Sequence, residues 1–160
     1  MKKTAAELQD GLSNFYGTEG YHRVSLLKNF VVTDGVLWLI QNAGEQGAFW
    51  ITDMIASYQK ECMAHPKLRE AQFWKLTVHP KEEQIPLPMT VGAVLASKKF
   101  KKPKPKPAAT MICEWDDGHT VIKQNIPYTD FQLPEISIWV EPQRDEQGNL
   151  LIIALLPSEH

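Results

Sequence analysis

The residues of this chain that could do chemistry gather around one polar trio, Tyr21-His22-Arg23. Three Thr-Asp pairs, ending at Asp34, Asp53 and Asp130, could add carboxylates to this trio. A histidine beside two or three carboxylates can bind a divalent metal or act as a general base. Thr-Asp pairs are also the usual chemistry of helix caps and turns, so the structural interpretation stays open. The candidate ligand- or partner-binding residues are Tyr21, His22, Arg23, Asp34, Trp50, Asp53 and Asp130.

Asp53 differs from the other two aspartates because it falls inside an expected helix, beside the apolar stripe of that helix. A partly buried carboxylate needs a partner, and Arg23 is the obvious one. We therefore favour a structural ion pair or hydrogen bond for Asp53, with Arg23 as its partner, and keep ligand binding and metal or acid–base catalysis as alternatives. A guanidinium fork is also the strongest directional contact that the chain can offer to a carboxylate or phosphate.

The two cysteines, Cys62 and Cys113, are too few for a disulfide framework. A cysteine nucleophile with His22 as its base is conceivable, but neither cysteine has a Gly-rich or electropositive local sequence that would lower its pKa. We predict that both are reduced packing residues. The sequence shows no metal-ligand spacing, phosphate-binding loop or nucleophile elbow. We therefore expect no metal, no cofactor and no catalytic residue.

Composition and charge predict one folded, acidic domain that spans residues 1–160. The chain is 43% hydrophobic and 22% charged, as in ordinary globular domains. Six of its 17 basic residues are lysines in the run Lys98–Lys106, which leaves 11 basic against 19 acidic residues elsewhere. We interpret residues 80–107 as a flexible Pro/Lys-rich insertion, most simply a solvated linker and alternatively an arm that touches an acidic partner. Direct nucleic-acid binding is expected only through that lysine run.

The first half of the chain shows helical spacing. Thr4 and Glu7 form a capping-box signature for a helix that ends near Leu12. Further helices are predicted from Thr33 to Gly44, from about Ala48 through Tyr58, and from Pro66 to about Gln72, while residues 21–26 are read as extended.

The second half changes to the alternating pattern of strands, beginning at Phe73–His79. Strands are further predicted at 91–96, 111–115, 120–126, 135–141 and 150–156, where the last four form two hairpins. The fold class is therefore α+β, with short N-terminal helices packed on one face of an antiparallel sheet. Trp139 should point away from that helical face, and with Trp115 it could mark a partner surface or be covered by a loop or by the Pro/Lys-rich arm.

Several motifs recur in a fixed order along the chain, including Tyr16-Gly17-Thr18-Glu19, Thr33-Asp34-Gly35-Val36, Phe49-Trp50-Ile51-Thr52-Asp53 and Leu156-Pro157-Ser158-Glu159. In this order they resemble domain of unknown function family 6876, found in bacteria, plasmids and bacteriophages. The resemblance covers nearly the whole chain and implies a small single-domain protein associated with mobile elements. It implies no catalytic residues.

Two classes of function follow as hypotheses. The first is a small non-catalytic binding protein, such as a mobile-element inhibitor of host defence that binds an effector protein or sequesters a nucleotide signal. The second is a hydrolase-like enzyme that uses His22 with Asp34, Asp53 or Asp130. No apolar run approaches the roughly 18 residues of a membrane span, and no signal peptide is apparent, so we expect a cytoplasmic protein. The sequence leaves the oligomeric state open, a homodimer included.

Overall fold

The computed structural model describes residues 2–84 and 105–160, which form four α-helices, seven strands and two short 3-10 helices. The helices are α1 (Ala5–Leu12), α2 (Asp34–Asn42), α3 (Phe49–Ser57) and α4 (Gln59–Ala64), with 3-10 helices η1 (Lys81–Glu83) and η2 (Pro157–Glu159). The strands are β1 (Tyr21–His22), β2 (Phe30–Thr33), β3 (Gln72–Val78), β4 (Ala109–Glu114), β5 (Thr120–Ile126), β6 (Glu135–Arg144) and β7 (Leu150–Leu155).

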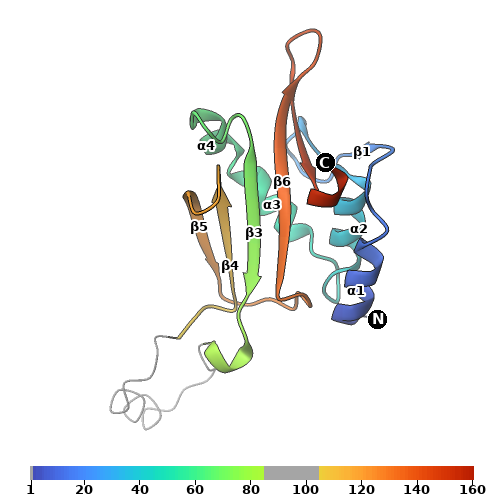
Figure 1. Ribbon diagram of the computed structural model, residues 1–160, viewed down its shortest axis with the longest axis vertical. Coiled ribbons are helices and arrows are strands. Elements are labelled where there is room, and N and C mark those ends of the chain that lie inside the picture. Colours follow the sequence, from blue (N-terminus) through green and yellow to red (C-terminus); the bar gives the residue numbers. More distant parts are fainter. Residues whose placement is uncertain (1, 85–104) are drawn as a thin grey trace.

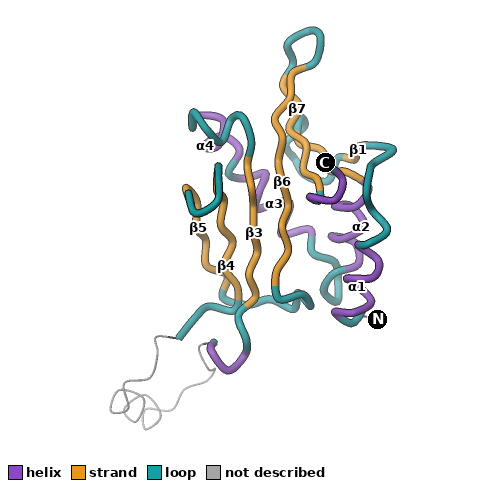
Figure 2. The backbone as a smooth tube through the Cα atoms, in the orientation of Figure 1, coloured by secondary structure: helices purple, strands orange, loops and turns teal. Residues whose placement is uncertain are grey.

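All seven strands belong to one sheet, in the order β1-β2-β7-β6-β3-β4-β5 (Figure 1). Every neighbouring pair is antiparallel except β2 and β7, which run parallel. The predicted α+β class is confirmed, with the sheet formed largely by the second half of the chain (Figure 2). The sheet is mixed rather than purely antiparallel because the N-terminal half contributes β2, which joins the last strand.

The helices cover one face of the sheet and enclose the core. Ile51 and Ile55 of α3 face Trp74, Leu76 and other inward residues of the central strands, and α3 lies behind β3 and β6 in Figure 1. Alternation along the strands sets this face, since each strand turns successive side chains to opposite sides. The outer face carries the remaining alternate residues, and there Phe73 and Trp139 meet edge to face.

The helix starts follow the predicted capping chemistry. Thr4 Oγ1 accepts the main-chain N–H of Glu7 at 3.2 Å, and the Glu7 carboxylate accepts the N–H of Thr4 at 2.8 Å. Thr33 caps α2 by accepting the N–H of Val36. Such caps satisfy main-chain donors that a helix leaves without an internal partner.

Two elements differ from the sequence prediction. The helix expected from Pro66 to Gln72 is wrong: this stretch is a turn in which Nδ1 of His65 accepts the N–H groups of Lys67 and Leu68, and the helix precedes it as α4. Strand β2 was not predicted, because all four of its residues are buried and so show no alternation.

The predicted Pro/Lys-rich insertion is described only at its ends, where Gln84 forms a bridge with Lys106. Residues 85–104, including the strand predicted at 91–96, lie outside the described residues. Among the helices of the described ranges, none has the length and apolar character needed to cross a membrane.

Candidate functional site

The start of helix α2 is the meeting point of three segments that lie far apart in the sequence. His22 Nε2 lies 2.7 Å from Asp34 Oδ1, so strand β1 is joined to the first residue of the helix. The other carboxylate oxygen of Asp34 accepts the main-chain N–H of Glu19 at 2.8 Å, and Thr18 Oγ1 accepts the N–H of Asp34 at 3.0 Å. These contacts tie the loop before β1 to α2.

The carboxylate of Glu159 brings the C-terminal segment to the same helix end. It accepts hydrogen bonds from the Thr33 hydroxyl at 2.6 Å, the N–H of Gly35 at 3.1 Å and the N–H of Leu156 at 3.0 Å. A Cβ atom on Gly35 would lie 2.6 Å from a Glu159 oxygen, so this close approach requires a glycine. Two carboxylates at a helix N-terminus are also favoured by the helix dipole.

The electrostatics of this cluster favour an ionised Asp34. The hydrogen bond from His22 holds the pKa of Asp34 below its ordinary value, and the N–H of Glu19 acts in the same direction. Both groups are partly exposed, with 38% of the His22 side chain and 30% of the Asp34 side chain accessible to solvent. A carboxylate that orients a histidine is one element of general-base chemistry. The remaining contacts of Asp34 are those of a structural cap.

Asp130 lies at the opposite end of α2. Its carboxylate accepts the N–H of Glu45 at 2.8 Å and lies against Gly44, which has a positive φ of 67° and follows Ala43, the extended residue that ends the helix. Nine helical residues separate the two ends, a distance of roughly 13 Å at about 1.5 Å per residue. Asp130 is therefore a loop anchor that does not join His22 and Asp34 in one site.

The predicted pairing of Arg23 with Asp53 is wrong. Both side chains are exposed, and no described residue forms a salt bridge with either of them. Asp53 lies on the solvent side of α3, whereas Ile51 and Thr52 face inward. Trp50, the second residue of that helix, packs against the core. The seven candidate residues thus divide into the His22–Asp34 contact, exposed Tyr21, Arg23 and Asp53, and two that pack or anchor elsewhere.

The two tryptophans proposed to form a partner surface do not pair with each other. Trp115 stacks on His119 with ring centroids 4.3 Å apart and receives Lys67 above its ring. Trp139 does face away from the helices, where it contacts Phe73 and His160. Each ring is therefore partly covered by residues of this chain.

Sequence reasoning missed two polar groups that the fold brings together. Glu159 was not a candidate, because its N-cap residue is Leu156 and the usual Ser or Thr signal is missing, although its carboxylate accepts the Leu156 N–H as in a capping box. The second is the buried amide pair Gln59 and Gln72, which exchange two hydrogen bonds of 2.9 Å. Within the described ranges, no group of three or more His, Cys, Asp or Glu residues could hold a metal ion.

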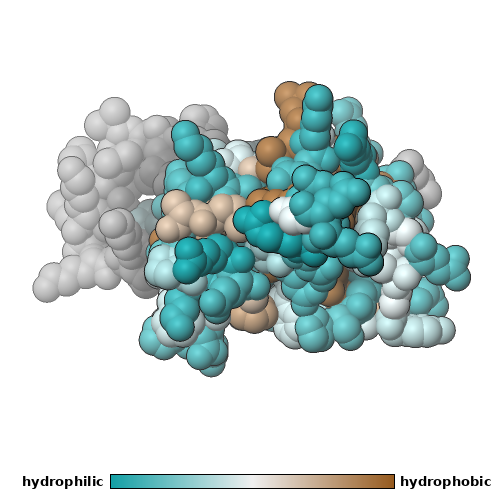
Figure 3. Space-filling view, turned by 90° about the horizontal axis from the view of Figure 1, so that it is seen from above, coloured by the Kyte–Doolittle hydropathy of each residue, from teal (hydrophilic) through white to brown (hydrophobic). Residues whose placement is uncertain are grey.

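The loops beside the α2 cluster expose an unusual set of large hydrophobic side chains. Tyr16 is 83% exposed, Tyr21 is 54% exposed and Leu26 is fully exposed, while Leu27 is partly so. Figure 3, which looks along the molecule from the end with the long β6–β7 hairpin, shows hydrophobic atoms standing out at one margin of a mostly hydrophilic surface. Exposed large apolar side chains that gather in one short segment, as these do, make that segment a candidate for interaction.

Comparison with known proteins places the chain in a family without assigning an activity. No curated protein and no solved structure matches it. The model of a family of unknown function, DUF6876, matches residues 6–160, so this protein belongs to that family.

Proposed function

We propose that this protein is a non-catalytic binding protein whose partner-binding surface is the segment of residues 16–27. The observation that carries the proposal is exposure: this segment holds four of the seven large hydrophobic side chains that stand exposed on the described residues. Arg23, also exposed, lies among them. Tyrosine and arginine are enriched at the energetic centres of protein interfaces, where they combine apolar area with hydrogen bonding.

The chemistry at the start of α2 supports binding rather than catalysis. Asp34 and Glu159 each accept several hydrogen bonds from the chain itself, which is how structural carboxylates behave. The buried cysteines are also poor nucleophiles, since both side chains are inaccessible to solvent.

The same contacts would give the binding segment a defined shape. The His22–Asp34 contact and the bond between Thr18 and the N–H of Asp34 hold the segment at two points. Pairing of β1 with β2 holds it at a third. A surface that is ordered before binding loses less conformational entropy when a partner docks, which favours affinity.

A protein is the partner that this surface fits best. Away from Lys98–Lys106 the chain carries 11 basic and 19 acidic residues, so an electropositive effector would be attracted. An inhibitor of host defence carried by a mobile element is the biological role we propose for such a protein. We place it in the cytoplasm, where the free thiols of Cys62 and Cys113 would persist. Sequestration of a nucleotide signal is the alternative within this class, and a thermal-shift screen with nucleotides would detect it.

A photo-crosslinking experiment tests the proposal. A photoreactive phenylalanine analogue replaces Tyr21 in one variant and Val121 in a matched control, since Val121 is comparably exposed but lies on the far edge strand β5. The protein crosslinked from host cells is identified, purified and titrated against Leu26→Asp, Arg23→Ala and the surface control Lys60→Ala. We expect crosslinking only at position 21 and at least roughly tenfold weaker binding for the first two variants. Equal crosslinking at both positions, or unchanged affinity of both variants, would contradict the proposal.

The hydrolase-like alternative rests on the 2.7 Å contact between His22 and Asp34, because a carboxylate can orient a histidine that acts as a base. His22→Asn and Asp34→Asn address it directly. Hydrolysis of generic phosphoester or ester substrates that both variants abolish, without loss of folding, would favour the enzyme over the binding protein.

A further inference from the structure

The sheet contains an interruption beside strand β6. That strand spans ten residues, and β3 pairs with it from Glu135 through Val140. On the other side, β7 pairs with it only from Trp139 to Arg144. Residues 135–138 of β6 therefore have a neighbouring strand on one side only.

The local sequence explains why β7 ends where it does. Continuing the register of β6 with β7 would place Pro157 opposite Ser137, since Leu155 is opposite Trp139. Proline has no N–H to donate to a ladder. By the alternation of the strand, the N–H of Leu156 points toward β2 like that of Ile152, and it donates to the Glu159 carboxylate at 3.0 Å, which holds the chain in a turn. The chain consequently leaves the sheet and forms η2.

The alternation of an antiparallel ladder identifies the main-chain groups that face the interruption. The N–H of Val78 donates to the carbonyl of Pro134 at 2.8 Å, so the carbonyl of Pro134 points toward β3. Main-chain groups of successive residues point to opposite sides. The N–H and C=O groups of Glu135 and Ser137 therefore point away from β3, toward the side that β7 has left. No described residue pairs with them there.

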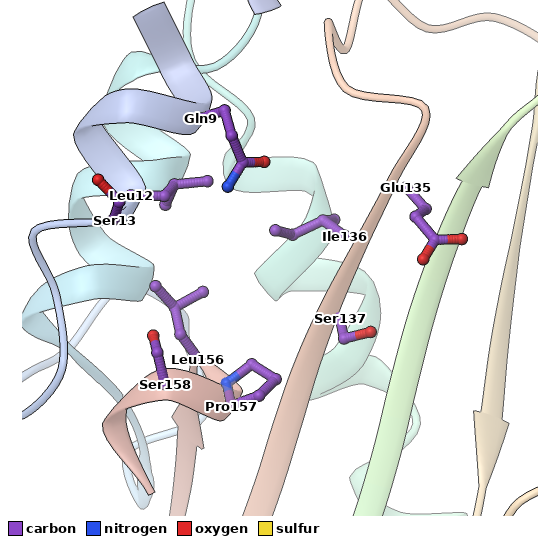
Figure 4. Close-up of a pocket in the computed structure, with 9 residues that line it drawn as sticks. All are labelled: Gln9, Leu12, Ser13, Glu135, Ile136, Ser137, Leu156, Pro157 and Ser158. Atoms are coloured by element: carbon purple, nitrogen blue, oxygen red, sulfur yellow. The ribbon is translucent and has the colours of Figure 1, made fainter. Parts of the chain in front are cut away.

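The space on that side is a cavity of about 300 Å³. Figure 4 shows it between helix α1, strand β6 and the C-terminal turn, with Gln9 and Leu12 on one wall and Ile136 on the other. Leu156 and Pro157 close one end. The side chain of Glu135 points away from the space, over β3, where it lies 3.6 Å from Lys75.

We propose that this interruption is a binding site for an extended peptide segment of a partner protein, which adds as a short strand beside residues 135–137 of β6. Strand addition is a recurring mode of peptide recognition, in which main-chain hydrogen bonds supply affinity and alternate side chains supply specificity. The site is separate from the proposed interface at residues 16–27 and goes beyond the proposed function.

The surroundings define the peptide that the site would take. The peptide residue opposite Ile136 would face inward against Leu12, Ile136 and Leu156, so an apolar side chain fits there. The peptide residues on either side of it would face outward, next to Glu135, which is largely exposed. The residues of helix α1 at the site, Gln9, Leu12 and Ser13, carry no charge, and the helix has no basic residue in its last turn. We therefore expect an apolar residue flanked by lysine or arginine, toward which the exposed Glu135 carboxylate turns from its 3.6 Å contact with Lys75 when the new strand pair forms.

Fluorescence anisotropy with a defined probe tests this inference. The probe is a seven-residue peptide with a central leucine between two lysines, serine or threonine elsewhere, and a fluorescent tag. One control peptide carries aspartate in place of both lysines. A second carries N-methyl groups on the two lysine amides, which would face β6. We expect saturable binding of the probe below ~1 mM and weaker binding of both control peptides, because they lose a charge pair or main-chain donors.

Variants of the protein distinguish binding through main-chain hydrogen bonds from nonspecific hydrophobic binding. Ser137→Pro removes an N–H that points into the interruption and that the ladder with β3 does not use, whereas Ser137→Ala keeps it. We expect Ser137→Pro to weaken binding roughly five- to tenfold, as the loss of one main-chain hydrogen bond requires, and Ser137→Ala to bind as the natural protein does. Gln9→Trp fills the space from the exposed face of α1 and should abolish binding. This second variant keeps the test valid if Ser137→Pro fails to fold.

Three results would overturn the inference. One is the absence of saturable binding by the lysine-flanked probe. Another is binding that N-methylation leaves unchanged, which would indicate a side-chain pocket. The third is full binding by a folded Gln9→Trp variant. Crosslinking at Tyr21 is independent of all three, so failure of this site and failure of the proposed function can be told apart.

Discussion

Replacing Gln72 by leucine should destabilise this protein more than its small change in size suggests. Gln72 and Gln59 are both buried and exchange hydrogen bonds of 2.9 Å, and the Gln72 oxygen also accepts the Trp74 Nε1–H at 2.9 Å. In Gln72→Leu, the Trp74 N–H and the Gln59 side-chain oxygen lose the partners that the structure gives them. The Gln59 amide keeps its bond to the carbonyl of Ile55.

The expected magnitude follows from the two orphaned groups. Leaving a buried polar group without a partner costs about 1–3 kcal/mol, so Gln72→Leu should lower the free energy of unfolding by roughly 2–6 kcal/mol. For a chain of this length, that loss corresponds to a fall in Tm of roughly 5–20 °C. In Gln59→Leu only the Gln72 amide is orphaned, because the Gln72 oxygen keeps Trp74, and about 1–3 kcal/mol is expected.

The double variant provides the sharper measurement. With both glutamines replaced, only the Trp74 N–H is left unsatisfied, so the double variant should be more stable than Gln72→Leu alone. Urea unfolding followed by tryptophan fluorescence gives the four free energies of the cycle. Gln143→Leu is the matched control because Gln143 is exposed on β6, and its effect should stay within about 0.5 kcal/mol. Additive losses in the double variant would refute the reasoning, since they would mean that the two amides do not depend on each other.

Three further predictions concern the α2 cluster and the thiols. Because the folded-state pKa of Asp34 is lowered, ionised Asp34 stabilises the protein above the unfolded pKa near 3.8, and this stability is lost as the pH falls through the folded-state pKa. On acidification, the urea midpoint of Asp34→Asn should therefore fall less steeply than that of the natural protein. Parallel curves for the two proteins would contradict this prediction. Gly35→Ala should cost roughly 1–3 kcal/mol, because its methyl group would meet Glu159, whereas Gly17→Ala, with open space around it, should stay within about 0.5 kcal/mol. Hydrogen bonding between the thiols raises the pKa of Cys113, to which burial also contributes, and lowers the pKa of Cys62. Because both side chains are inaccessible, a thiol reagent should label them only as denaturant unfolds the protein. Rapid labelling of the native protein would support the hypothesis of a cysteine nucleophile.

Local rules predicted the parts of this fold that depend on neighbours in the sequence. The capping box at Thr4 and Glu7 involves residues three apart, and both of its hydrogen bonds are present. The strand beginning at Phe73 depends on period-two alternation, and β3 has it. Strand β2 had no such signal because it is buried on both faces, and its parallel pairing with β7 joins residues more than a hundred positions apart.

The candidate site was predictable only in part, for the same reason. His22 and Asp34 could be named as polar residues of the right types, and they do meet. The burial of Asp53 was predicted wrongly because helical periodicity shows which face of a helix is apolar but not where that face ends. A shift of one position decides whether a side chain faces the core or solvent. Glu159 reaches α2 from the far end of the chain, so nothing local to either segment indicated the contact.

The interruption beside β6 shows how a functional candidate can arise from a strand that stops early. The sequence from Leu150 to Leu156 is apolar throughout, and that pattern alone predicts a strand reaching Leu156. Pro157, which cannot donate, stops the ladder with β6 from continuing, while the N–H of Leu156, on the β2 side, donates to Glu159. Glu159 also accepts the N–H of Gly35, so one carboxylate joins the start of α2 to the turn that follows β7. Glu159→Ala should therefore loosen the start of α2 and the turn after β7 together, and faster hydrogen exchange at both Gly35 and Leu156 would confirm this, whereas unchanged exchange at either would contradict it.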